Sequence, residues 1–156
     1  MKMRSGTGRL GEVIVARLAP GSDVYNSIRM IVEQHGIRSG LILGGAASLR
    51  KAVLRNLARF PNFPITDADR QFVKIEGSPL EMLSLNGNIS TFEGRVWVHA
   101  HICVSSGAEN GRSYGGHLVE GCEVLSTAEI AIARLDGIEL LRLKDPETQG
   151  LELFFR

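Results

Sequence analysis

Residues 94–106 read GRVWVHAHICVSS, and the alternation of side-chain types in this stretch is the clearest structural pattern in the chain. Successive side chains of a β-strand point to opposite faces of the sheet. One face of this segment is apolar, and we expect it to be buried: Val96, Val98, Ala100, Ile102 and Val104. The other face is chemically richer: Trp97, His99, His101, Cys103 and Ser105. The stretch therefore predicts a strand with one buried face, which is typical of an antiparallel sheet.

Several further segments have the same strand-like character, with β-branched and apolar residues bounded by turn formers. They are residues 12–21, 40–45, 72–77, 80–90, 122–135, 138–143 and 150–156. Residues 48–60 fit either a strand or a helix, whereas the prolines and polar residues of 60–69 predict a loop. The chain is therefore expected to be mainly β-sheet.

Residues 22–36, SDVYNSIRMIVEQHG, form the one strong helix pattern. Ser22 or Asp23 can cap the start of the helix, and Gly36 suits the left-handed conformation just past its end. The apolar positions fall on one face: Val24, Ile28, Ile31 and Val32. One principal helix packed across a mainly antiparallel sheet predicts an α+β fold.

The composition predicts a single domain over residues 1–156. The chain has 44% hydrophobic and 22% charged residues, which is typical of a globular protein. Two cysteines do not make a disulfide framework, and no signal peptide or apolar run of membrane-spanning length is visible, so we expect a cytoplasmic location.

The small net charge of +1 is unevenly distributed along the sequence. Residues 1–60 carry ten Lys or Arg and three acids, whereas the remainder carries eight bases and fourteen acids. Such asymmetry can indicate an acidic partner or charge matching within an oligomer. The simplest interpretation is that these charges mix in three dimensions.

Three of the four histidines lie close together in the sequence, at positions 99, 101 and 117. The Cα atoms of residues i and i+2 in a strand are about 6.5–7 Å apart, so His99 and His101 can converge on one ion. His117 would have to return from a connecting segment, which the turn formers of SGAENGRS (106–113) and the glycines Gly115 and Gly116 would allow. Three histidines with an open fourth position are typical of a catalytic or ligand-exchanging zinc site.

The spacing of these residues alone leaves two other interpretations open. Cys103 or Cys122 could complete the ligand shell, although water or an outside ligand fits better. Alternatively, His99 and His101 are polar residues on the solvent face of a sheet, and His117 is a hydrogen-bonded loop residue.

Other candidate residues carry weaker signals. Glu81 is a candidate general base, or a carboxylate that orients a metal-bound histidine. The basic segment RKAVLRNLAR (50–59) predicts a solvated basic face, with a site for phosphate or another anion as the alternative. No dinucleotide or phosphate-binding loop and no nucleophile elbow are present in the sequence.

Five sequence blocks, taken in order, resemble the plant and prokaryote conserved (PPC) domain family over residues 10–145. They are RLAPGSDVYNSIRMIVEQHGI, LILGGAASL, LEMLSLNGNIS, HAHICVS and GGHLVEGCEVLSTAEIAI. The resemblance implies a homotrimer, and it implies that His99, His101 and His117 hold a metal ion. It also implies an association with DNA, although the AT-hook motif R-G-R-P is missing from this sequence, so the chain resembles a stand-alone prokaryotic member.

The leading hypothesis is therefore a DNA-binding or regulatory protein that carries a three-histidine site for zinc or another divalent metal. The second hypothesis is a metal-dependent enzyme or small-molecule-binding protein that uses the same site. The third is a trimeric assembly module in which the metal is structural. The sequence leaves open whether the protein is an enzyme.

Overall fold

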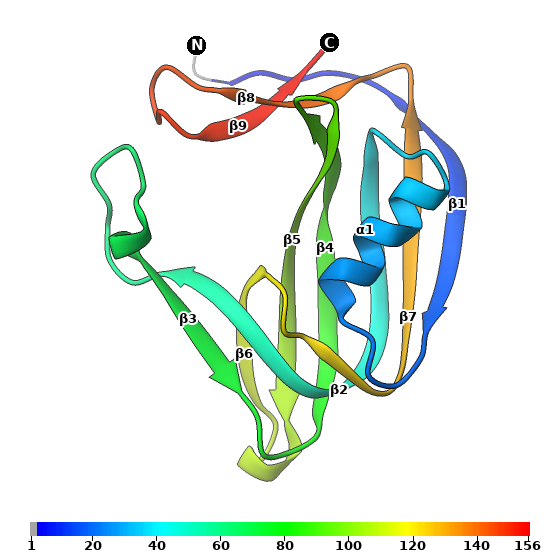
Figure 1. Cartoon of the computed structure of the whole chain (residues 1–156), viewed down its shortest axis with the longest axis vertical. Coiled ribbons are helices and arrows are strands. Elements are labelled where there is room, and N and C mark those ends of the chain that lie inside the picture. The colour runs from blue at the N-terminus through cyan, green and yellow to red at the C-terminus, as the bar shows by residue number, and fades with distance from the viewer. Residues whose placement is uncertain (1–2) are drawn as a thin grey trace.

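The computed structural model describes residues 3–156 and consists mainly of one antiparallel sheet with a single α-helix in this range (Figure 1). Met1 and Lys2, one of the ten bases counted above, lie outside the described residues. The strands are β1 (Arg9–Leu18), β2 (Gly40–Leu57), β3 (Arg70–Ile75), β4 (Leu80–Phe92), β5 (Arg95–Ser106), β6 (Arg112–Leu118), β7 (Glu123–Asp136), β8 (Leu140–Lys144) and β9 (Leu151–Phe155). The predicted α+β architecture is confirmed.

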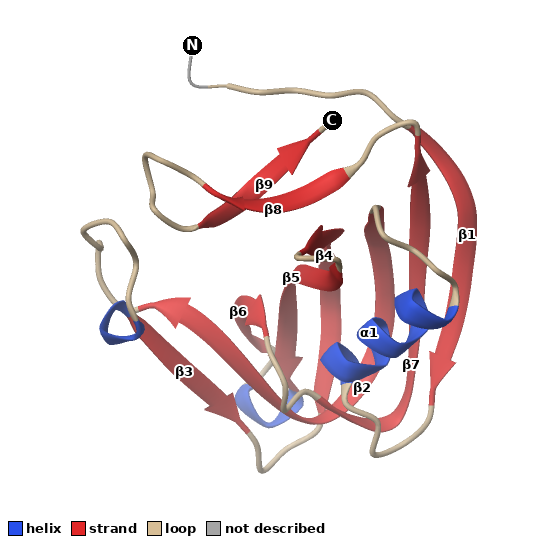
Figure 2. Cartoon of the chain, turned by 45° about the horizontal axis from the view of Figure 1, so that its top comes forward, coloured by secondary structure: helices blue, strands red, loops and turns tan. Residues whose placement is uncertain are grey.

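The strands follow the order β1-β7-β2-β6-β5-β4-β8-β9, and β3 pairs with β2 off this path. Strand β2 also pairs with β4, so β2, β4, β5 and β6 form a closed circuit of antiparallel pairs. The one parallel contact in the described sheet joins Thr91 of β4 to Leu141 of β8. Figure 2 shows β3 at the left of this circuit and the β8–β9 hairpin above it.

Helix α1 (Val24–Gln34) lies across the sheet and contacts β5. Asp23 caps the helix by accepting a hydrogen bond from the Asn26 N–H at 2.9 Å, and Gly36 adopts a left-handed φ of 63° just past the helix end. Val24, Ile28 and Val32 are buried in the core that also holds the apolar face of β5. Both the predicted helix and its buried face are confirmed.

Strand β2 differs from the sequence-based prediction, because residues 40–45 and most of 48–60 belong to one continuous strand, which ends at Leu57. The glycines Gly44 and Gly45 bend the strand instead of ending it. Gly44 has a φ of 149°, and the pairing of β2 with β7 shifts register beside it. A Cβ atom at Gly45 would clash with the Glu129 carbonyl oxygen of β7, so the glycine permits close pairing of the two strands.

Residues 107–118 also differ from the prediction of a connecting segment. A short 3₁₀ turn, η2 (Gly107–Glu109), is followed by Asn110 and Gly111 with φ values of 55° and 79°. These residues reverse the chain, and the following residues form β6, which pairs with β5 as a hairpin. His117 therefore lies on a strand beside His101, in a position fixed by hairpin register.

No helix in the described part of the chain combines the length and apolar character that a membrane crossing requires.

Candidate metal centre

Hairpin register brings the three histidines together on one face of the sheet. His101 of β5 lies directly opposite His117 of β6, and side chains of directly opposite residues share a face. His99 lies two residues from His101 and therefore points to the same face. The ring centroids are 5.5 Å apart for His99 and His101, 4.9 Å for His99 and His117, and 5.3 Å for His101 and His117.

These three imidazoles form the one group in the described residues that could hold a metal ion, with ligand atoms within 4.8 Å of one another. In a tetrahedral zinc site with bonds of about 2.0–2.1 Å, ligand nitrogens lie about 3.4 Å apart. Small side-chain rotations would bring the ligand nitrogens from separations of up to 4.8 Å to this distance. The donor set is therefore chemically suited to zinc, and it leaves one coordination position for a further ligand.

The electrostatic environment keeps the imidazoles of His99 and His117 uncharged. Burial, followed by the positive charge of Arg55, lowers the pKa of His117 from 6.5 to about 3. Burial, followed by the positive charge of Arg142, also lowers the pKa of His99. A neutral imidazole offers the lone pair that a metal ion needs, so His99 and His117 are in the metal-binding protonation state at pH 7.

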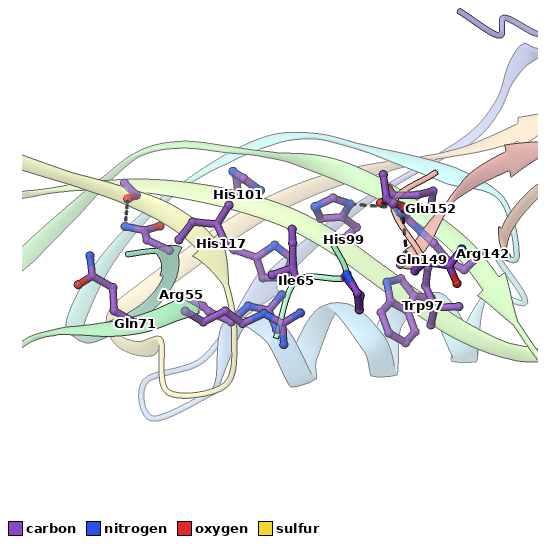
Figure 3. Close-up of a pocket in the computed structure, with 18 residues that line it drawn as sticks. Arg55, Ile65, Gln71, Trp97, His99, His101, His117, Arg142, Gln149 and Glu152 are labelled. Atoms are coloured by element: carbon purple, nitrogen blue, oxygen red, sulfur yellow. Dashed lines mark hydrogen bonds between the residues drawn. The ribbon is translucent and has the colours of Figure 1, made fainter. Parts of the chain in front are cut away.

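Arg142 of β8 is the closest polar neighbour that sequence reasoning missed. It is 4% exposed, and its guanidinium donates hydrogen bonds to Ser90 Oγ at 3.2 Å and Asn88 Oδ1 at 2.8 Å. It also donates to His99 Nδ1 at 3.0 Å (Figure 3). The available signal was an arginine on the buried face of a strand, two residues after Leu140. Because leucines lie on both faces of that strand, the sequence pattern did not show which face is buried.

The hydrogen bond between Arg142 and His99 constrains how a metal ion could bind. A guanidinium only donates hydrogen bonds, so Nδ1 of His99 is the acceptor, and the proton of the neutral ring lies on Nε2. Ligation through Nε2 would require that proton to move to Nδ1, whereas ligation through Nδ1 would displace the guanidinium. In either case, metal binding separates Arg142 from His99.

The histidines line an open cavity of about 1010 Å³. Residues from β2, β3, β5, β6 and the β8–β9 hairpin form its walls, and Figure 3 shows Trp97, Arg55, Gln71 and Glu152 around the three imidazoles. Arg55 of β2 lies directly opposite His117 in the sheet, so its side chain shares the face that carries the histidines. The arrangement can hold an ion next to a space large enough for a small molecule.

Three other sequence candidates lie outside this cluster. Glu81 is exposed and faces Ser105 across the β4–β5 ladder, several residues from His101, and it does not line the cavity. Cys103 shares the strand face of the histidines, but it is not part of the group that could hold a metal ion. Cys122 is fully buried in the core, where its thiol donates to the Val53 carbonyl and burial raises its pKa to about 11.

The basic segment 50–59 is divided between ion pairs and the cavity. Arg50 and Lys51 both contact Glu123, at 3.2 and 3.6 Å, and Arg59 contacts Asp69 at 2.8 Å. Arg55 alone among these bases lines the cavity. The segment therefore does not form a continuous free basic face.

Known proteins resemble this chain in both sequence and fold. Bifunctional protein GlmU of Synechococcus sp. (strain JA-3-3Ab) is 33% identical over 147 residues, which are 94% of this chain and 21% of that protein. The chain thus spans about a fifth of the length of that relative. The metal-containing protein AF0104 of Archaeoglobus fulgidus is 27% identical, with a TM-score of 0.76 and coverage of 97% of this chain and 99% of that one.

A plant- and prokaryote-conserved protein of Pyrococcus horikoshii is also 27% identical, with a TM-score of 0.77 and coverage of 96% of each chain. Two further structures are described as candidate DNA-binding proteins, but at 18% and 22% identity their likeness shows the fold alone. The model of the Plants and Prokaryotes Conserved (PCC) domain matches residues 5–136. The chain therefore belongs to the Plants and Prokaryotes Conserved domain family.

Proposed function

We propose that this protein holds a divalent metal ion, zinc, through His99, His101 and His117, and binds a small-molecule ligand at the remaining coordination position. The observation that carries this proposal is the convergence of three imidazoles from β5 and β6 on the wall of an open cavity. The metal-containing relative from Archaeoglobus fulgidus, which covers nearly the whole chain, supports the same conclusion.

The open side of the cluster favours ligand exchange over a purely structural ion. Structural zinc sites are usually closed by four protein ligands, whereas catalytic sites keep a position for water or substrate. Within residues 3–156, only three metal-ligating side chains converge here. When bound, zinc would act as a Lewis acid and lower the pKa of a coordinated water.

The surrounding side chains have defined tasks in this proposal. The hydrogen bond from Arg142 holds the His99 ring in place until metal binding separates the two groups. Trp97 and residues of the β8–β9 hairpin form the cavity wall beside His99. A metal-dependent enzyme is the alternative use of the same site, and a trimeric assembly module with a structural metal is the third candidate.

Metal content measured on untagged protein tests the proposal. We expect about one zinc per chain by elemental analysis, and loss of that zinc in the His99→Ala, His101→Ala double variant. Cys103→Ser is the matched control on the same strand face, and it should retain the metal. A folded wild-type protein that takes up no metal, or a double variant that retains it, would contradict the proposal.

DNA binding is the second candidate function, favoured by the descriptions of two proteins with the same fold as candidate DNA-binding proteins. Phosphate contacts make the logarithm of affinity fall with the logarithm of salt concentration. A mobility-shift assay on duplex DNA should then show binding that weakens steeply with salt. Lack of any shift at low salt would eliminate this candidate.

The homotrimer and the cytoplasmic location stay predictions.

A further inference from the structure

Two arginines without acidic partners flank the histidine cluster. Arg55 is half-buried and forms no ion pair or hydrogen bond through its side chain within residues 3–156. Arg142 is 4% exposed, and its three hydrogen bonds go to neutral groups and leave Nη1 without a partner among the described residues. Buried charges are normally paired, so both guanidinium groups favour an external negative charge.

The other charges that line the cavity do not cancel these two. Glu152 is the one acidic residue in its lining. Burial lowers the pKa of Arg142 and outweighs the charge of Glu152, which raises that pKa. Arg70 adds a third arginine, which is paired with the exposed Asp67 at 2.6 Å. The cavity is therefore positive before any metal ion binds, and a divalent cation would increase that charge.

We propose that the cavity binds a small organic anion, a carboxylate or a phosphate monoester, whose negative group lies between Arg55 and the histidine cluster. This inference rests on the proposed function, because the negative group is expected to occupy the coordination position that the three histidines leave open. A guanidinium matches both classes of anion, since its N–H groups donate in pairs to carboxylate or phosphate oxygens.

The remaining walls suit an apolar or planar body attached to that anion. Trp97, Leu57 and Ile65 line the cavity, and the first two are 39% and 50% exposed. Gln71 and Gln149 add neutral hydrogen-bonding groups on the same lining. The apolar side chains thus form part of a lining that is otherwise largely polar, which suits a ligand with one charged end and a small apolar body.

Trp97 also makes the test direct, because it is the only tryptophan of the chain and it lines the cavity. We would titrate zinc-loaded and metal-free protein with benzoate, phenyl phosphate and neutral benzamide, and follow tryptophan fluorescence. We expect saturable quenching by at least one anion and none by benzamide at the same concentrations. The preference between benzoate and phenyl phosphate distinguishes the two classes of anion.

The decisive variant is Arg55→Gln, which removes the positive charge at this position. The substitution breaks no ion pair, because Arg55 forms none with the described acidic residues. It should weaken anion binding by about tenfold or more, the equivalent of about 1.4 kcal/mol. Arg50→Gln is the matched control, because Arg50 lies on the same strand, is exposed and does not line the cavity. This control should bind the anion as wild type does.

Three results would overturn the inference: neither anion binds, benzamide binds as tightly as benzoate, or Arg55→Gln binds as wild type does. Zinc-loaded protein that binds no anion removes this inference and leaves the proposed metal centre standing. Wild-type protein that takes up no zinc removes the metal centre instead. The titration of metal-free protein then decides whether the anion site exists. Anion binding that Arg55→Gln weakens supports the site, and absence of anion binding overturns it.

Discussion

His117 owes its low pKa to its position on β6 between β2 and β5. Its imidazole is half-buried, and it faces His101 on one side and Arg55 on the other. Burial and the neighbouring positive charge both disfavour protonation of the ring, which lowers its pKa to about 3. The same two causes act on His99 through Arg142. Protons therefore compete weakly with a metal ion at these two residues near neutral pH.

The low pKa of His117 predicts an acid-sensitive free energy of unfolding for metal-free protein. Between pH 6.5 and about 3 the unfolded chain binds this proton and the folded chain does not. The contribution of neutral His117 is therefore complete above pH 6.5 and declines as the pH falls toward 3. Urea midpoints at pH 7 and pH 4.5 should differ more for wild type than for His117→Asn.

The matched control for this measurement is His35→Asn, at the exposed C-terminal end of α1. It should keep the pH dependence of wild type. An equal pH dependence in wild type and His117→Asn would contradict the assignment.

Arg142 provides a second prediction at the scale of single residues. Its charge lies 3.0 Å from His99 Nδ1 and opposes a nearby cation, so Arg142→Met should tighten zinc binding by about tenfold or more. Arg142→Lys keeps the charge and should not tighten it. Competition with a chromophoric chelator measures both affinities. Weaker zinc binding in Arg142→Met would show that the arginine assists the metal ion instead of opposing it.

At the scale of elements, the site depends on β6 fitting closely between β5 and β2. Gly116 allows this approach, because a Cβ atom there would clash with the Asn56 side-chain oxygen and lie 3.1 Å from Leu54 Cβ. The Asn56 Nδ2 group also donates to the Gly115 carbonyl at 3.1 Å, which ties β6 to β2. The position of His117 therefore follows from the packing of a whole strand.

The two neighbouring glycines offer a matched comparison. Gly116→Ala should lower the free energy of unfolding by about 1–3 kcal/mol, a typical cost of overpacking, and weaken zinc binding by displacing His117. Gly115→Ala should do neither, because its Cβ atom would meet only ordinary contacts, the nearest at 3.7 Å. Thermal denaturation and chelator competition measure the two effects. Similar behaviour of the two variants would contradict this account of β6.

Elements with a regular amphipathic pattern were predictable from the sequence, and strand partners were not. Helix α1 and strand β5 have a clear periodicity, so their buried faces followed from local pattern. The continuity of strand β2 could not be predicted, because a glycine pair is typical of a strand end. Only the pairing of these glycines with β7 shows that the strand continues. The sequence also grouped His99 with His101, whereas the approach of His117, Arg55 and Arg142 depends on long-range register.

At the scale of the whole molecule, the uneven charge of the sequence becomes mixed. Bases of the first 60 residues pair with later acids, as in Arg50 and Lys51 with Glu123, and Arg134 in turn lies 3.7 Å from Glu12. These contacts agree with the interpretation that the unevenly distributed charges mix in three dimensions. Arg55 and Arg142 of the cavity are not among the bases paired in this way.

Strand β1 is the outermost strand at one end of the sheet and carries exposed apolar side chains, including Val13 at 51% and Val15 at 77% exposure. Edge strands present unpaired backbone groups, so a second copy of the chain is a suitable partner for this surface. If the homotrimer uses it, Val15→Glu should lower the mass measured by light scattering. Met30→Glu, at an exposed position of α1, should leave the mass unchanged. A trimer that persists in Val15→Glu would exclude this surface.

Anomalous X-ray diffraction from crystals of zinc-loaded protein, recorded on both sides of the zinc absorption edge, would locate the metal ion directly. We expect one anomalous peak per chain, about 2.0–2.1 Å from a nitrogen of each of His99, His101 and His117. Arg142 should have moved away from His99 in that state. Crystals with no peak at these histidines, or with zinc bound only elsewhere, would contradict the account.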